Sequence, residues 1–104
     1  MELNSMEFLV LLRPTRPDFV QSMTEEETRA VGQHLEHLKA AAAAGKVLVA
    51  GRSMTDNPVG VEIIEADSEE EARKLVEQDP AVKEGIMRPE ILPFRVAVSA
   101  LKVR

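Results

Sequence analysis

The sequence predicts an α+β protein of the ferredoxin-like type, a βαββαβ sandwich in which an antiparallel four-stranded sheet carries two helices on one face. Three observations predict it, and the first is a length of 104 residues, the size of one domain. Apolar runs of strand length alternate with two longer helical stretches. Each helical stretch starts with a capping box. We therefore expect a single domain over 1–104, with 1–5 as a short N-terminal extension.

The first strand is expected over 6–12, because this run is apolar almost throughout and prolines follow it. A loop over 13–23 contains these prolines and several polar turn formers. The first helix begins at Thr24, whose capping box with Glu27 suits the positive end of the helix dipole, and it ends at Gly45. One apolar stripe along this helix is expected to face the core: Val31, Leu35, Leu38 and Ala42.

Two more strands and the second helix follow. The second strand is expected over 47–54, and a polar turn containing a proline joins it to a third strand over 60–66. Ser68 forms the second capping box with Glu71. The helix that starts there ends near Gln78, because the residue before a proline disfavours helix.

The chain closes with a short helical turn over 80–85 and a final strand expected over 91–101. Pro89 and Pro93 stand at the start of this strand, and prolines are tolerated in edge strands. In the ferredoxin-like arrangement the first and third strands are central and the second and fourth are edges. The strongly apolar first strand agrees with that placement.

The face of the sheet away from the helices is expected to be apolar. The first strand is apolar at consecutive positions over 8–12, and the second strand is similar over 47–50. Nothing else in 104 residues covers that face. We therefore expect a homodimer, or a higher homo-oligomer, in which two open faces close into a dimeric α+β barrel. The alternative is a monomer with an apolar solvent face.

The composition excludes several kinds of chemistry. The chain has no Cys, hence no disulfide, thiolate metal site or thiol nucleophile, and a cytoplasmic localisation is expected. Its two His residues cannot form a three-histidine zinc site within one chain, and neither a metal nor a cofactor is expected. A net charge of -5 and 3% aromatic residues argue against nucleic acid as a partner. The apolar run near the N-terminus is too short to span a membrane.

Both histidines are expected on the first helix, three residues apart. At roughly 100° per residue, His34 falls at the rim of the apolar stripe and His37 falls toward solvent. A rim imidazole can reach a pocket between helix and sheet and act there as an acid or base near neutral pH. The alternative for His34 is a boundary residue hydrogen-bonded to a backbone carbonyl. An i, i+3 pair could also ligate a metal, but a third ligand would have to come from elsewhere.

Asp79 is a further candidate. It is expected at the end of the second helix, where the helix dipole disfavours a carboxylate, and such a misplaced acid invites a functional explanation. The alternative is a turn-forming Asp before Pro80. Arg13, Arg52 and Ser53 are candidates for substrate binding, since strand-end Arg side chains can bind a carboxylate or a hydroxyl. They could equally be solvated, and Ser53 lacks the context of a serine nucleophile.

Five segments occur in a fixed order: His34-Leu35-x-x-Leu38, Val47-Leu48-Val49-Ala50-Gly51, Ala66-Asp67-Ser68-x-Glu70-Glu71-Ala72, Asp79-Pro80-x-Val82-x-x-Gly85 and Pro93-Phe94. Together they resemble the YCII-related (YciI-like) family, and the resemblance covers 6–98. Two positions depart from the family pattern. Arg52 stands where the family often has a proline, and Ala81 stands where it often has an aromatic residue.

The resemblance implies a ferredoxin-like protomer in a dimeric α+β barrel, with an active site that contains a His–Asp pair. The matching residues here are His34 and Asp79. Relatives include a protein thought to remove chloride from a chlorinated hydroxyhydroquinone. One hypothesis is therefore a cofactor-free enzyme in which this pair transfers protons during elimination or isomerisation of a small molecule, such as a phenol or a lactone. The alternative is a non-catalytic module that binds a small ligand or an interaction partner.

Overall fold

The computed structural model describes residues 6–100. The expected N-terminal extension, 1–5, and the end of the expected final strand, at 101, lie outside the described residues. The strands are β1 (Met6–Pro14), β2 (Val47–Arg52), β3 (Gly60–Ala66) and β4 (Met87–Phe94). The helices are the 3-10 turn η1 (Val20–Ser22), α1 (Glu25–Ala43), α2 (Glu69–Glu77) and α3 (Pro80–Lys83).

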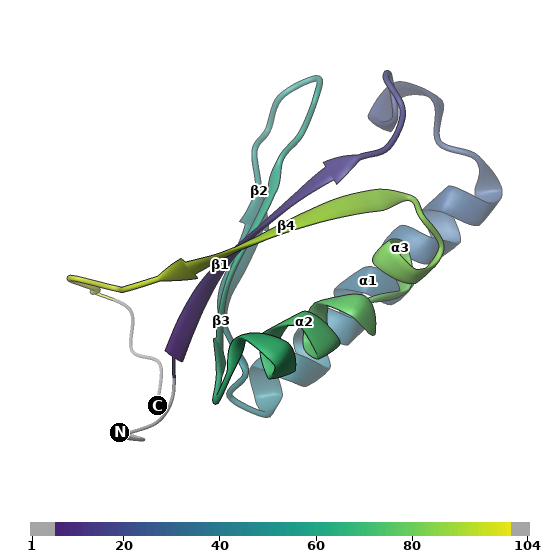
Figure 1. Ribbon diagram of the computed structural model, residues 1–104. Coiled ribbons are helices and arrows are strands. Elements are labelled where there is room, and N and C mark those ends of the chain that lie inside the picture. Colours follow the sequence, from purple (N-terminus) through teal and green to yellow (C-terminus); the bar gives the residue numbers. More distant parts are fainter. Residues whose placement is uncertain (1–5, 101–104) are drawn as a thin grey trace.

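Within the described residues the strands form one antiparallel sheet in the order β2-β3-β1-β4. α1, α2 and α3 lie together on one face of it (Figure 1), so the ferredoxin-like α+β fold is confirmed. β1 and β3 are the central strands, as their apolar runs predict. β2 ends at Arg52, short of the expected residue 54. Among residues 6–100, no helix combines the length and the hydropathy that crossing a membrane requires.

β4 begins at Met87 and not at the expected residue 91, because its prolines are part of the strand. Pro89 lies opposite one residue of β1 and Pro93 opposite another, and in the described sheet β4 pairs with β1 alone. A proline whose missing N–H faces the free edge disturbs no ladder hydrogen bond. The expected start of this strand was therefore wrong, whereas its place at the edge is confirmed.

The core lies between the sheet and the helices, and the expected stripe of α1 is only partly in it. Leu38 packs against the core, but Leu35 is 51% exposed. The buried residues of α1 are Ala30 and Ala41, whose small side chains let the helix pack closely against α3 and β2. The stripe instead borders a groove between α1 and β2. The sheet supplies most of the buried side chains: Phe8, Val10, Leu12, Val47, Ile64 and Ala66.

Both predicted helix starts are confirmed, with one difference in hydrogen bonding. The capping box at Thr24 forms in full. At α2 the Ser68 hydroxyl accepts the Glu71 N–H, while the Glu71 carboxylate accepts the N–H of Asp67 and not that of the cap residue. α1 ends before Gly45, whose φ of 77° lies in the left-handed region that favours glycine.

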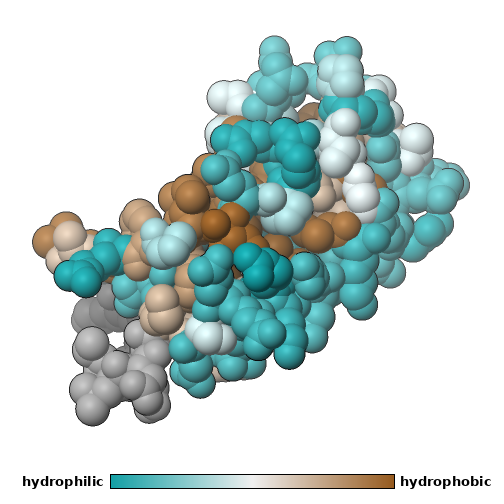
Figure 2. All heavy atoms as spheres, in the orientation of Figure 1, coloured by the Kyte–Doolittle hydropathy of each residue, from teal (hydrophilic) through white to brown (hydrophobic). Residues whose placement is uncertain are grey.

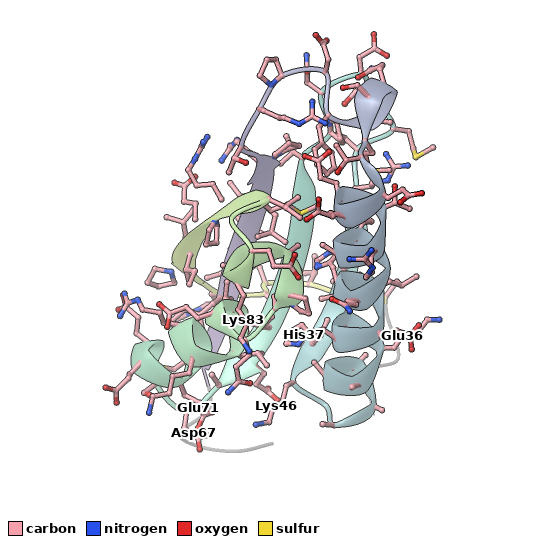
Figure 3. The ribbon with its side chains drawn as sticks, turned by 90° about the vertical axis from the view of Figure 1, so that its right-hand side faces the viewer. Glu36, His37, Lys46, Asp67, Glu71 and Lys83 are labelled. Carbon is pink, nitrogen blue, oxygen red and sulfur yellow. The ribbon has the colours of Figure 1, made fainter. Side chains whose placement is uncertain are left out.

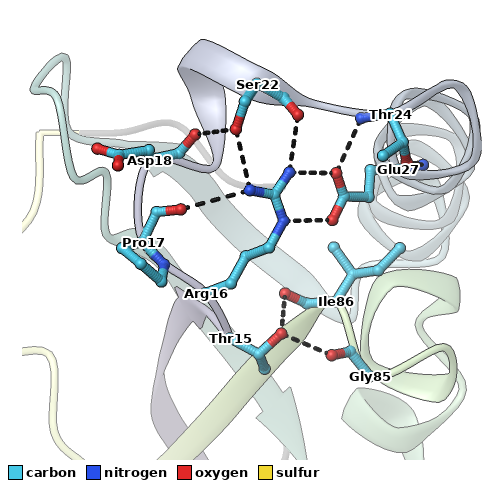
Figure 4. Close-up of polar contacts among 9 residues, drawn as sticks. All are labelled: Thr15, Arg16, Pro17, Asp18, Ser22, Thr24, Glu27, Gly85 and Ile86. Carbon is cyan, nitrogen blue, oxygen red and sulfur yellow. Dashed lines mark hydrogen bonds and ion pairs between the residues drawn. The ribbon is translucent and has the colours of Figure 1, made fainter.

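The Arg16 guanidinium holds the loop between β1 and α1 (Figure 4). It donates to both Glu27 carboxylate oxygens, at 2.6 and 2.9 Å, and to the hydroxyl and carbonyl of Ser22, at 2.9 and 2.8 Å. The Arg16 hydrogen bond is the main reason why the pKa of Glu27 is lowered to about 2. The loop fixed in this way carries Phe19 and Met23 into the wall of the groove.

Candidate active site

Asp79 lies between α2 and α3 and forms the N-cap of α3. Its Oδ1 accepts the N–H of Ala81 at 2.9 Å, and Pro80 occupies the first turn, where proline is favoured. The expectation that a helix dipole disfavours this carboxylate was wrong. Asp79 stands at the N-terminus of α3, where the dipole favours a carboxylate, and not at the C-terminus of α2. Asp79 is 2% exposed, so its second oxygen also needs a partner inside the protein.

His34 on α1 is that partner. Its Nδ1 lies 2.6 Å from Oδ2 of Asp79, and the two side chains are 15% and 3% exposed. With Nδ1–H as the donor to the carboxylate, Nε2 is the nitrogen left for other contacts. Burial lowers the pKa of His34, but the hydrogen bond and charge of Asp79, together with the charge of Glu62, outweigh burial and raise it. The fold thus joins the two residues that the sequence singled out.

Glu62 is a third member of this cluster, and the sequence reasoning missed it. It lies on β3 and is 6% exposed, and a carboxylate oxygen of Glu62, a ring nitrogen of His34 and a carboxylate oxygen of Asp79 all lie within 4.8 Å of one another. The pKa of Glu62 is raised to about 7, first by burial and then by the negative charge of Asp79, while the charge of His34 opposes the rise. A signal was present in the sequence, because the two-residue period of β3 places this glutamate on the same face as Ile64 and Ala66.

His34 and Glu62 line the groove between α1 and β2, which has a volume of about 610 Å³, while Asp79 lies behind them and is not among the lining residues. The walls are mainly apolar, with α1 on one side and β2 on the other. Its charged or titratable lining residues are His34, Lys39, Arg52 and Glu62. A cavity with apolar walls and a few polar groups is the usual form of a small-molecule site.

The same three residues are close enough to share a metal ion. Asp79, however, already uses one oxygen on His34 and the other on Ala81. A metal would have to break those bonds or rely on Nε2 and Glu62 alone, and protein sites for transition metals normally supply three or four ligands. The arrangement suits proton transfer better than metal binding.

The remaining candidates lie apart from the His34–Asp79 pair. Arg13 forms an ion pair with Glu90 at 3.2 Å and does not line the groove, whereas Arg52 does line it. The Ser53 hydroxyl accepts the N–H of Val59 at 2.9 Å, which braces the turn between β2 and β3.

His37 was expected to face solvent, but it is half-buried. Figure 3 shows it on the side of α1 that faces α3 and Lys83, while Glu36 points away from that side. His37 lies four residues before the buried Ala41 and therefore on the same side of α1, which accounts for its burial. His37 is not among the residues that line the groove.

Comparison with known proteins supports the fold. Residues 6–95 match the family model described as the YCII-related domain. The chain is similar to the 5-chloro-2-hydroxyhydroquinone dehydrochlorinase TftG from Burkholderia phenoliruptrix AC1100, solved with 2,5-dihydroxybenzoquinone, with a TM-score of 0.63 and 24% identity over 85% of this chain and 93% of that one. A monooxygenase from the gene ActVA-Orf6 of Streptomyces coelicolor, solved with nanaomycin D, aligns with a TM-score of 0.46 and 16% identity over 96% of both chains. No curated protein matches the chain.

Proposed function

This chain belongs to the YCII-related family, and from that premise we propose that it is a small-molecule enzyme in which His34 and Asp79 transfer protons. The reaction class is elimination, in the manner of a dehydrochlorination, or isomerisation, on a small cyclic molecule. The proposed reaction uses no metal and no organic cofactor. The observation that carries the proposal is the 2.6 Å contact between the two residues beside an apolar groove.

In this proposal Asp79 positions the imidazole and stabilises its charged form, as carboxylates do for catalytic histidines. The N–H of Ala81 holds the carboxylate itself in place. His34 then presents Nε2 to a substrate in the groove and takes or gives a proton there. The apolar walls lower the polarity around the site, which strengthens the electrostatic interactions between its charged groups.

The first substrate to test is 5-chloro-2-hydroxyhydroquinone, which the dehydrochlorinase with the same fold is named for. Related hydroquinones and unsaturated lactones and ketones complete a panel, with chloride release and absorbance as readouts. We expect His34→Ala to lower kcat by about 10²–10⁴-fold, the usual contribution of general acid–base catalysis. Asp79→Asn keeps a good N-cap residue while it removes the charge, so it should lower kcat without unfolding α3.

The matched control is His37→Gln, which changes the other histidine of α1 and leaves the groove lining intact. It should keep full turnover. Turnover that survives in His34→Ala at the level of the unchanged protein would sink the proposal. A panel on which the unchanged protein has no activity would also count against it.

A non-catalytic binding module is the second candidate, and the apolar walls of the groove favour it. In that case a small apolar molecule would bind tightly and be recovered unchanged. Binding would then survive in His34→Ala, because the walls and not the imidazole would supply the affinity. Mass spectrometry of the bound molecule before and after incubation separates this function from the enzyme.

We propose in addition that the partner of this chain is a second copy of itself, joined through the open face of the sheet, and that the protein acts in the cytoplasm. The half-buried Leu9, Leu11 and Ile63 support the dimer, as does Leu92, which is 39% exposed. Leu9, Leu11 and Ile63 alternate with the core residues in β1 and β3, and Leu92 of β4 lies opposite Leu9, so all four lie on the face without helices. Figure 2 shows hydrophobic side chains along the sheet beside β4, with the hydrophilic helices on one side of them. Apolar surface of this kind usually marks an interface.

A further inference from the structure

Glu62 is a nearly buried carboxylate on β3, and nothing in the packing of the fold requires a charged residue there. It is 6% exposed, yet its carboxylate accepts no hydrogen bond from any residue within 6–100. No fully buried side-chain oxygen of the described residues lacks a partner, so the carboxylate of Glu62 is open to the groove that the residue lines. Burying a carboxylate without a hydrogen-bond donor is costly, and an apolar side chain would serve the core better.

We propose that Glu62 is a second proton-transfer residue, which acts on the substrate together with His34 while Asp79 positions the imidazole. This inference rests on the proposed function and extends it. Asp79 has both oxygens committed, to His34 and to the N–H of Ala81, so it is not free to exchange protons with a substrate. Nε2 of His34 and the carboxylate of Glu62 are the groups of the cluster that remain available.

The charges around Glu62 come from three elements. α1 contributes His34, the start of α3 contributes Asp79, and the groove adds Lys39 from α1 and Arg52 from β2. Like charge from Asp79 favours the protonated acid at Glu62, while a charged imidazole favours the carboxylate. Two groups this close titrate as a coupled pair, and a single proton held by the pair can sit on either member. In each arrangement the site contains one acid and one base.

An isomerisation of an unsaturated ketone shows how the pair would work. The Glu62 carboxylate takes a proton from the carbon beside the carbonyl; the C–H electron pair becomes a C=C bond, and the carbonyl π pair moves to oxygen. The His34 imidazolium gives its Nε2 proton to that oxygen, so a neutral dienol forms. The dienol returns its O–H proton to His34 as the carbonyl re-forms, and its far carbon takes the proton from Glu62. Both residues end as they began, and no other reactant is consumed.

The first test is a titration that needs no substrate. The His34 Cε1–H signal is followed by NMR against pH in the unchanged protein and in Glu62→Gln, and it is assigned with His34→Gln. We expect the His34 midpoint to fall in Glu62→Gln, because the variant removes a neighbouring negative charge. The control is Glu36→Gln, which removes an exposed glutamate from the helix that carries His34. Glu36 pairs with the exposed Lys39, so this variant should leave the His34 midpoint unchanged. An unchanged midpoint in Glu62→Gln overturns the proton sharing.

The second test uses turnover of whichever panel substrate the protein accepts. Glu62→Gln should lower kcat by about 10²-fold or more with little change in KM, and it should remove one limb of the pH profile. Glu62→Asp should restore part of the rate. Activity lost in His34→Ala but fully kept in Glu62→Gln overturns this inference alone. Activity kept in His34→Ala overturns the proposed function instead.

Discussion

Glu62 makes the stability of the fold depend on pH, because its pKa is about 7 in the folded protein against an ordinary value of 4.5. Between these values the folded state keeps a proton that the unfolded chain has released. Stability therefore falls as pH rises from about 4.5 to about 7 and stays lower above that range. Glu62→Gln removes this loss, so we expect it to be more stable than the unchanged protein at about pH 8, by on the order of 3 kcal/mol.

Thermal unfolding at about pH 8 and about pH 4.5 checks this prediction. The advantage of Glu62→Gln should disappear at the lower pH, where both the folded and the unfolded chain hold the proton. Glu36→Gln should show no such pH dependence, since that side chain is 73% exposed. An advantage that is equal at both pH values would mean that packing, and not ionisation, sets the stability of this position.

At the residue scale the sequence led to His34 and Asp79, through helix geometry for the first and a shared family motif for both. The argument that an unfavourable helix dipole acts on Asp79 failed, because α2 ends just before this residue. Asp79 is the N-cap of α3, and the N-terminus of a helix favours a carboxylate. Glu62 escaped notice because a glutamate in a strand is ordinarily a solvent-facing residue. The two-residue period of β3 already indicated that this glutamate faces inward, and its place beside His34 and Asp79 shows it.

The loop that Arg16 holds is an element whose stability depends on charge. The pKa of Glu27 is lowered to about 2, so this pairing stabilises the fold fully above about pH 4.5 and is lost as pH falls toward 2. We expect Arg16→Gln to lower the unfolding temperature at neutral pH, and the difference from the unchanged protein to shrink at about pH 2 to 3. Arg73→Gln is the matched control, because its ion pair with Glu69 is exposed and contributes little. A difference independent of pH would contradict the role of the Glu27 charge.

At the scale of elements, capping residues predicted the starts of α1 and α2 well, since a cap is a local interaction. The start of β4 was wrong by four residues, because the strand already pairs with β1 from Met87 onward, ahead of both prolines, whereas its place at the edge was predicted correctly. The stripe of α1 was also wrong for Leu35. Helix period identifies an apolar face, but the side of α1 that packs inward carries the small buried residues Ala30 and Ala41, and Leu35 lies away from it.

At the scale of the whole molecule, the open face predicts the state of assembly. We expect light scattering at micromolar concentration to give about twice the 11.5 kDa mass of one chain. Leu92→Asp should shift the protein toward the monomer, because it places a charge on the apolar face. Leu35→Asp, on the helix side of the molecule, should leave the dimer intact. A mass near 11.5 kDa for the unchanged protein would contradict the dimer.

The two hydrogen bonds of Asp79 tie the order of a short helix to the order of the site. α3 has four residues, too few to be stable by themselves, so it depends on the cap and on its neighbours. When α3 frays, the carboxylate that holds His34 is released at the same moment. The rate of hydrogen–deuterium exchange at the Ala81 amide therefore measures how often α3 opens and the His34–Asp79 contact is lost. This opening can be followed well below the temperature at which the whole protein unfolds.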